Sequence, residues 1–278
     1  MMKKYFVFLF YFILTLGLIF SVRYLFRLGT EPFPTLDSTA STTATLPPTT
    51  LPPSTTATTT VTTTTSPPTT AELFPAYKIT ATLVQATDQL PKGYTGPVVY
   101  GKGGVFYRVV SPDGYAVRVD ASGLTLSAPE ERALPPVDKA AIEKLANDNA
   151  FISKTDYLVV CSLYRLETYV FEASPRGWTL IKRMDCSAGD LSHPTPTGVY
   201  QIEAKYPAIG KSGEYTCPYA VGFFGNYLFH SVPLTPDQST PVDARIGGRI
   251  SNGCVRLRTA DAQWLYQTLP LGTAVVIF

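Results

Sequence analysis

A cysteine near the end of the chain stands in a setting that suits a nucleophile. Cys254 follows a glycine in the stretch ISNGCVRL, residues 250–257. Gly253 has no side chain, so the backbone is unshielded where a substrate carbonyl could approach. Arg256 adds a positive charge, which is expected to lower the pKa of the thiol and favour the thiolate. The residue types are compatible with a nucleophile, and half of a disulfide or a small buried thiol are the alternatives.

A thiol nucleophile needs a base to accept its proton, and the sequence offers two histidines. His230 follows an apolar strand pattern in GNYLFHSVPL, where a turn can present the ring to a cleft. His193 lies in the proline-rich SHPTPTG, which favours a structural or cleft-lining position. Position therefore favours His230 as the base.

The four cysteines argue against a metal site. None of them forms a C-x-x-C pair, and two histidines do not supply the usual ligand spacing of a closed zinc site. Cys161 falls on the apolar face of its segment with Val159 and Leu163, as expected for a buried free thiol. Cys186 with Cys217 is the remaining candidate disulfide, which the sequence cannot test because it gives no distance.

The first 31 residues predict a membrane anchor. Residues 5–22 read YFVFLFYFILTLGLIFSV, an uncharged apolar run about long enough to cross the hydrocarbon core as a helix. The run ends in large residues rather than in a small-x-small cleavage site, which favours an uncleaved anchor over a signal peptide. Two lysines precede it and favour a cytoplasmic N-terminus. We expect a cytoplasmic tip and single-pass anchor at residues 1–31, with the folded part of the chain on the extracytoplasmic side.

Residues 32–71 are nearly all Thr, Pro, Ser and Ala and predict a disordered spacer. Such a composition cannot bury enough apolar surface to fold, and its paired prolines favour extended polyproline II. Beyond the spacer the chain is formally neutral, because 19 of the 23 basic and 19 of the 21 acidic residues lie there. Proteins that follow nucleic-acid phosphates carry a basic excess, so we expect no nucleic-acid partner.

Residues 72–136 predict a small all-β module. Short runs with strand character, YKITATLVQ, GVFYRVVS and YAVRVDASGLTLS, are separated by turn signals such as PKGYTG and PDG. The strand lengths and turn spacing resemble those of bacterial SH3-like wall-targeting modules. The alternative is a β extension packed on the next domain.

The rest of the chain predicts strands with two helices. Residues 137–153 form a linking helix with Asp138 as its cap and apolar positions at helical spacing, namely Ile142, Leu145 and Ala146. TADAQWLYQTL predicts the second helix, with Thr259 as N-cap. Its apolar face consists of Ala262, Leu265, Tyr266 and Leu269. The strand segments are DYLVVCSLYR, ETYVFEA, WTLIKRMDC and the final TAVVIF.

Residues 157–278 resemble the L,D-transpeptidases of bacterial cell walls, whose catalytic domain is of the YkuD type. The matching parts occur in the family's order: YLVVCSLYRLETYVFE, TPTGVYQI, YLFHS, ISNGCVRL, DAQWLY and LGTAVVIF. The resemblance implies a mainly β, YkuD-like β-sandwich catalytic domain with one or two helices, at residues 154–278. It implies no cofactor, and a substrate in the wall outside the membrane, which fits the predicted anchor and spacer.

The family's pattern runs from a histidine to Ser/Thr-His-Gly-Cys, followed by Arg or Asn. His230 matches the first histidine, the proton acceptor, and Cys254 matches the nucleophile. Asn252 replaces the second histidine, and an amide can donate a hydrogen bond but cannot become cationic. The resemblance implies catalytic roles for Cys254, His230, Ser231 and Gly253, and substrate contacts from Ser251, Asn252, Arg256 and Tyr227. Two of these have alternatives: Arg256 as a structural ion pair under the active loop, and Tyr227 as packing, with Phe229, for the strand that carries His230.

The resemblance implies formation of 3→3 cross-links between peptidoglycan tetrapeptide stems. Cys254 would attack the carbonyl after the third stem residue, D-alanine would leave, and an amine of a second stem would resolve the acyl-enzyme. Ser231 would orient the His230 ring through its carbonyl or hydroxyl, and the N–H groups of Gly253 and Cys254 would hold the oxyanion. A carbapenem adduct on Cys254 is also implied.

Three alternatives to the transpeptidase stay open at this point. Resolution of the acyl-enzyme by water would make the chain an L,D-carboxypeptidase. Asn252 could instead mark a non-catalytic peptidoglycan-binding protein that keeps the fold. A sortase-like transpeptidase fits less well, because its usual Thr-Leu-x-Thr-Cys lead-in is absent.

Overall fold

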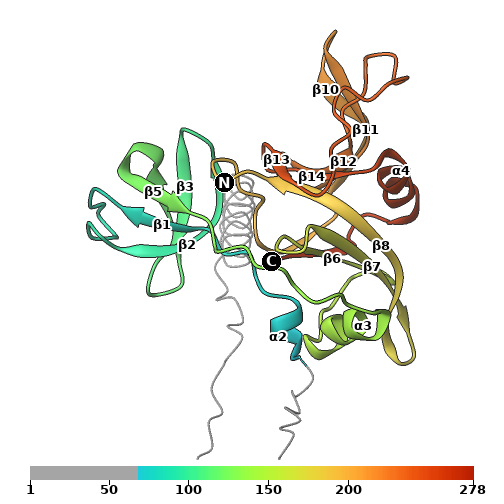
Figure 1. Ribbon diagram of the computed structural model, residues 1–278, viewed down its shortest axis with the longest axis horizontal. Helices are drawn as coiled ribbons and strands as arrows, with labels where there is room; N and C mark the ends of the chain where they lie inside the picture. The colour runs from blue at the N-terminus through green and yellow to red at the C-terminus, as the bar shows by residue number, and fades with distance from the viewer. Residues whose placement is uncertain (1–67) are drawn as a thin grey trace, which may run out of the picture. The chain divides into compact units, whose positions relative to one another are not determined.

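The computed structural model describes residues 68–278 (Figure 1). The predicted anchor, residues 1–31, and nearly all of the predicted spacer lie outside the described residues. Within residues 68–278, no helix combines the length and the apolar character needed to span a membrane. Two β-sheets dominate this part of the chain, one of five strands and one of ten, which confirms the mainly β class.

The smaller sheet forms the predicted all-β module. A short helix precedes it, α2 (Thr70–Leu73), and the sheet contains β1 (Thr80–Leu83), β2 (Thr95–Lys102), β3 (Phe106–Val110), β4 (Ala116–Asp120) and β5 (Leu124–Ser127). Its strand order is β4-β3-β2-β1-β5, antiparallel throughout, with a 3-10 turn, η1 (Ala121–Gly123), before the last strand. Inward positions alternate along β3 and β4, as a half-buried sheet requires, and the alternation of β2 shifts at an irregularity between Val98 and Tyr100. The SH3-like assignment stays a prediction.

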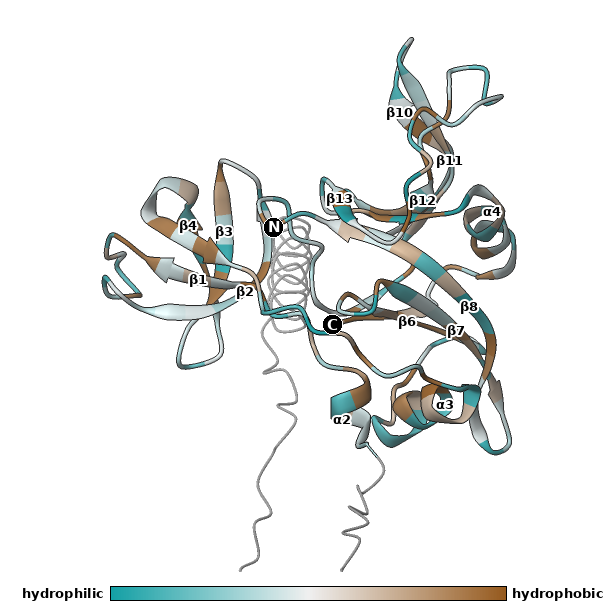
Figure 2. Ribbon diagram, in the orientation of Figure 1, coloured by the Kyte–Doolittle hydropathy of each residue, from teal (hydrophilic) through white to brown (hydrophobic). Residues whose placement is uncertain are grey.

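The linking helix is shorter than the predicted range. α3 (Lys139–Asp148) begins after Asp138, whose carboxylate accepts a hydrogen bond from the Ala141 N–H at 2.8 Å. The predicted apolar positions Ile142, Leu145 and Ala146 are all buried. They pack on one face of the larger sheet, while the opposite side of the helix is hydrophilic (Figure 2).

The larger sheet carries the C-terminal half of the chain. Its strands are β6 (Tyr157–Ser162), β7 (Glu167–Ser174), β8 (Gly177–Gly189), β9 (Gly198–Gln201), β10 (Ala204–Lys211), β11 (Tyr215–Phe224), β12 (Tyr227–Ser231), β13 (Arg249–Ser251), β14 (Val255–Leu257) and β15 (Ala274–Ile277). The strand order is β10-β11-β12-β14-β8-β7-β6-β15-β9, with β13 attached to β8. The sheet is curled, and the β10–β11 hairpin extends away from its body (Figure 1). Most neighbours are antiparallel, but three pairs run parallel: β12 with β14, β6 with β15, and β8 with β13.

One face of this sheet and α4 (Thr259–Thr268) enclose the main core. Phe223, Phe229 and Val255 are fully buried there, and α4 contributes Ala262 and Leu265. The predicted cap of this helix is wrong. Thr259 is its first helical residue, Arg258 occupies the N-cap position, and no side chain caps the end.

The candidate disulfide between Cys186 and Cys217 is not formed, and all four cysteines are free thiols. Cys186 lies on β8 and Cys217 on β11, and β12 and β14 lie between these two strands. Three strand spacings correspond to roughly 14 Å, well beyond the Cα separation a disulfide allows. Cys186 instead lies against the Cys161 thiol, and that contact together with burial raises its pKa.

Candidate active site

The strands β12 and β14 place the histidine and the cysteine of the sequence pattern on neighbouring segments of the sheet. Their parallel register pairs Phe229 with Val255 and His230 with Arg256. Cys254 immediately precedes β14, which pairs with β12, the strand that carries His230. The Cys254 thiol is partly exposed and donates to the Asn226 carbonyl at 3.7 Å. Two segments that are distant in sequence therefore present a thiol and an imidazole at one place on the sheet.

The His230 ring is held in one orientation by its neighbour. Its Nδ1 lies 2.6 Å from the backbone carbonyl oxygen of Ser231. A carbonyl can only accept, so Nδ1 carries the proton and a neutral ring leaves Nε2 bare. The Ser231 hydroxyl donates to the Val232 carbonyl at 2.8 Å, so it is the Ser231 carbonyl rather than its hydroxyl that contacts the ring.

Burial keeps both reactive groups neutral. It lowers the pKa of His230 to about 4, the Arg256 charge acts in the same direction, and the Ser231 carbonyl opposes both. Burial also raises the pKa of the Cys254 thiol, against a smaller opposite effect of the Leu228 N–H. The expectation that Arg256 would favour the thiolate is therefore wrong. At neutral pH the two groups are therefore a protonated thiol and an imidazole without a proton on Nε2.

Arg256 is committed to an ion pair. Its guanidinium lies 2.8 Å from the Asp243 carboxylate, and its side chain is 11% exposed. Arg245 binds the same carboxylate from the solvent side, also at 2.8 Å. Of the two predicted roles for Arg256, this geometry favours the structural ion pair over a contact with a substrate carboxylate.

Hydrogen bonds within the loop stabilise the segment that carries Cys254. The Ser251 hydroxyl donates to the Cys254 carbonyl at 2.5 Å and accepts from the Gly253 N–H at 3.2 Å. Gly253 has a φ of +105°, a conformation that residues with a side chain rarely adopt. Because the Gly253 N–H is already bonded within the loop, the Cys254 N–H is the remaining oxyanion donor of the two that were predicted.

Asn252 and Tyr227 occupy different surroundings. Asn252, at the position of the family's second histidine, is exposed at the tip of the loop. The Tyr227 ring lies against Gly253, and its hydroxyl donates to the Gly101 carbonyl of the β-module at 2.8 Å. Burial, the Cys254 thiol and Tyr100 raise the pKa of Tyr227 to about 12, so the hydroxyl stays protonated.

The segment 189–195 also supports the nucleophile loop, and sequence reasoning gave it no such part. The Asp190 N–H donates to the Ser251 carbonyl at 3.1 Å, and the Asp190 carboxylate lies 3.1 Å from Nδ1 of His193. His193 thus belongs to the support of the loop. The only signal in the sequence was its place in a turn-rich stretch, from which no contact with Ser251 can be read.

Residues 156–277 match the family model of the L,D-transpeptidase catalytic domain, YkuD. The matched residues are nearly the same as those in which the sequence resemblance was found.

Two curated relatives carry the family's name. YciB of Bacillus subtilis, whose name places it among the L,D-transpeptidases, is 47% identical over 119 residues, which are 40% of this chain and 60% of that protein. YbiS of Escherichia coli K12, named for the same activity, is 34% identical over 83 residues, 30% of this chain and 27% of that protein. The matches therefore span less than two thirds of either relative.

A solved structure from Clostridium acetobutylicum, a fused zinc-dependent amidase/peptidase/peptidoglycan-binding domain-containing protein, is 36% identical to this chain. The match covers 50% of this chain and 59% of that one, with a TM-score of 0.44.

Proposed function

We propose that this protein is a peptidoglycan L,D-transpeptidase that forms 3→3 cross-links through an acyl-enzyme on Cys254. The observation that carries the proposal is the neutral thiol–imidazole pair on a catalytic domain of this family. Cys254 is partly exposed, and His230 beside it is fixed by the Ser231 carbonyl with Nε2 free. A nucleophile with an oriented base is the arrangement that acyl transfer requires.

In the first half of the reaction the thiol attacks the carbonyl that follows the third residue of a tetrapeptide stem. As the sulfur–carbon bond forms, the thiol proton passes to Nε2 of His230, and the Cys254 N–H donates to the developing oxyanion. A ring whose pKa is about 4 gives up this proton readily, so it can protonate the departing amine. D-alanine leaves and the stem remains as a thioester.

In the second half a primary amine of another stem attacks the thioester. His230 is again neutral and takes the proton that the amine loses, and the returning sulfur recovers it as the carbon–sulfur bond breaks. The products are an amide cross-link and free enzyme. If water attacks instead, the same residues act as an L,D-carboxypeptidase.

Asn252 is the proposed substrate contact on the loop, because its amide is exposed and can donate to a stem carbonyl or carboxylate. Ser251 and Arg256 are less suited to this part, since the hydroxyl of one is bonded within the loop and the charge of the other is paired. Their expected effect on substrate runs through the shape of the loop.

The proposed setting is the extracytoplasmic side of the cell membrane. The apolar run at residues 5–22 and the Thr/Pro-rich spacer support an anchored head that reaches the wall. A carbapenem that acylates Cys254 is the corresponding inhibitor, and intact mass spectrometry would detect the adduct.

The test is mass spectrometry of the detergent-solubilised full chain with a disaccharide-tetrapeptide. Loss of D-alanine together with cross-linked dimers is expected, and both should disappear in Cys254→Ala and His230→Gln. Cys161→Ala, which changes a fully buried thiol away from β12 and β14, is the matched control and should keep activity. Loss of D-alanine without dimers would support the carboxypeptidase. Binding of wall fragments with no turnover would refute catalysis.

A further inference from the structure

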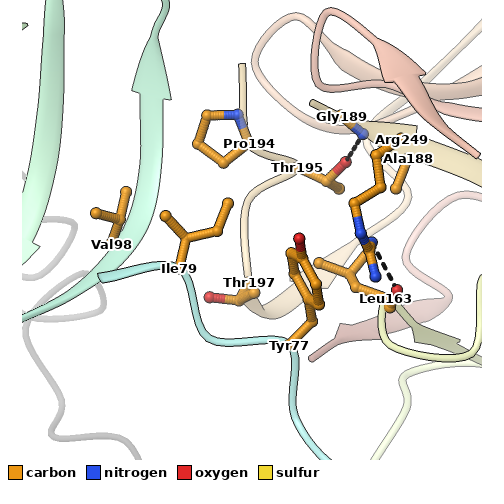
Figure 3. Close-up of a pocket in the computed structure, with 10 residues that line it drawn as sticks. All are labelled: Tyr77, Ile79, Val98, Leu163, Ala188, Gly189, Pro194, Thr195, Thr197 and Arg249. Atoms are coloured by element: carbon orange, nitrogen blue, oxygen red, sulfur yellow. Dashed lines mark hydrogen bonds between the residues drawn. The ribbon is translucent and has the colours of Figure 1, made fainter. Parts of the chain in front are cut away.

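The β-module is packed on the catalytic domain rather than attached by a free linker. A cavity where they meet encloses about 10 Å³, roughly one water molecule, and Tyr77, Ile79 and Val98 line it from the module (Figure 3). Across the cavity, Arg249 places its guanidinium 3.3 Å from the centre of the Tyr77 ring. Arg249 also donates to the Leu163 carbonyl at 2.9 Å. The apolar core is continuous across this junction.

The β2–β3 hairpin of the module bonds directly to the segment that supports the nucleophile loop. The Thr197 N–H donates to the Val99 carbonyl at 3.0 Å. The Tyr107 hydroxyl donates to the Ser192 carbonyl at 2.8 Å. One hairpin therefore holds the 189–197 segment at its middle, through Ser192, and at its end, through Thr197.

The tip of the hairpin lies on the same segment. A Cβ added at Gly103 would stand 2.2 Å from Nε2 of His193, so the backbone of the tip and the imidazole are in close contact. A Cβ added at Gly189 would stand 2.0 Å from the His193 carbonyl oxygen and 2.9 Å from the Cα of Gly253. The hairpin tip, the segment and the nucleophile loop thus form a continuous stack without room for a further side chain.

Tyr227 joins the module to the nucleophile loop in one step. A Cβ added at Gly253 would stand 2.4 Å from the Tyr227 ring, and the hydroxyl of that ring donates to the Gly101 carbonyl. Phe224 stacks on Tyr227 with 6.0 Å between ring centres. Phe224 in turn meets the module's Tyr100 at 5.3 Å. The proton of the Tyr227 hydroxyl is therefore engaged by the protein.

We infer that the β-module is a fixed part of the active site, and that Tyr227 is a positioning residue through which the module holds the Gly253–Cys254 loop. Glycine is conformationally free at the positive φ of Gly253, so surrounding contacts are needed to hold the loop in one conformation. The Tyr227 ring supplies one of these contacts, and the Gly101 carbonyl fixes the ring. On this view the module serves placement of the thiol and is not a separate wall-targeting unit.

The first test compares Tyr227→Phe with Tyr94→Phe in the full chain. Each substitution removes one tyrosine hydroxyl bond to a backbone carbonyl, but the Tyr94 bond, to Val110 at 2.7 Å, lies entirely within the module. Tyr227→Phe should lower kcat about three- to tenfold with little change in KM, because a lost hydrogen bond of this kind changes positioning and not binding. Tyr94→Phe should leave kcat unchanged while lowering thermal stability about as much as Tyr227→Phe does.

Alkylation of Cys254 by iodoacetamide is the second readout, and it needs no wall substrate. The other three thiols are buried, so the native reaction reports on Cys254. Tyr227→Phe should change this rate by at least about twofold, and Tyr94→Phe should not. The turnover readout rests on the proposed transpeptidase activity, whereas alkylation does not. A wild-type chain without turnover would thus refute the proposed function and still leave the positioning role decided by alkylation.

A second pair of variants acts through space and not through a hydrogen bond. Gly103→Ala would push into the His193 ring, whereas Gly123→Ala would meet its nearest neighbour, Val119, at an ordinary 3.7 Å. Only Gly103→Ala should alter the alkylation rate and kcat. The inference is overturned if Tyr227→Phe behaves like Tyr94→Phe in both readouts, or if Gly103→Ala behaves like Gly123→Ala.

Discussion

The buried imidazole of His230 should lower the free energy of unfolding at acid pH, and this loss should disappear when His230 is replaced. Its pKa is about 4 in the folded protein and 6.5 for the free group. Below pH 6.5 the unfolded chain binds a proton at this ring, and the folded chain does not until near pH 4. The contribution of this ring to the free energy of unfolding therefore falls as the pH drops from 6.5 to 4, and it is constant above this interval. The whole gap corresponds to about 3.4 kcal/mol, and roughly 2 kcal/mol of it is lost by pH 5.

Urea unfolding of the wild type and of His230→Gln, near pH 7.5 and near pH 5, measures this loss. The wild type should lose about 2 kcal/mol more than the variant between the two conditions. His193 and all carboxylates are present in both proteins, so their contributions cancel in the comparison. An equal loss in the two proteins would show that the ring is not buried in its neutral form, and the reasoning would fail.

The same burial determines the pH dependence of the reaction. His230 stays neutral, and so remains a base, down to about pH 4. The acid limb of kcat/KM should therefore lie near pH 4 and not near the ordinary histidine value. A midpoint near 6.5 would indicate a solvated ring and contradict the structure.

Two further substitutions test the loop and the ion pair beneath it. Gly253→Ala should lower the free energy of unfolding by about 2 kcal/mol or more and abolish alkylation of Cys254 in the native protein. Both the positive φ at this position and the contact with the Tyr227 ring oppose a side chain. An unchanged urea midpoint and unchanged activity would contradict this. Asp243→Asn should cost about 2 to 3 kcal/mol in urea unfolding, since it leaves the buried Arg256 charge unpaired, whereas Arg245→Gln on the solvent side should cost about 0.5 kcal/mol or less. Equal losses for the two variants would show that Arg256 does not depend on this carboxylate.

Local patterns in the sequence predicted the parts of the fold that local physics decides. Helical spacing gave the buried face of α3, and the capping preference of aspartate gave its start at Asp138. Alternation placed Cys161 in the core beside Val159. In contrast, β2 was missed because its first residues belong to a stretch rich in glycine and proline, which reads as a turn. Pairing with β1 and β3 makes it a strand.

The properties of the candidate site depended on contacts between distant parts of the chain. A positive residue two positions from Cys254 suggested a thiolate, but Asp243 pairs that charge, and burial raises the pKa of the thiol. The hydrogen bond from Tyr227 to Gly101 joins residues 126 positions apart, and no spacing in the sequence indicates it. The order of residues therefore predicts which groups react, whereas their protonation and their support depend on the tertiary packing.

Because the four cysteines differ in burial, the reactivity of the native thiols can be used to follow unfolding. Three of the four cysteines are buried, namely Cys161, Cys186 and Cys217, and the fourth, Cys254, is partly exposed. A thiol-counting reagent should thus register one fast equivalent in the native protein and four after denaturation. The appearance of the three slow equivalents would time the opening of the core, strand by strand, without any introduced label. A covalent adduct on Cys254 would remove the fast equivalent, and the three slow equivalents would still report the opening of the core.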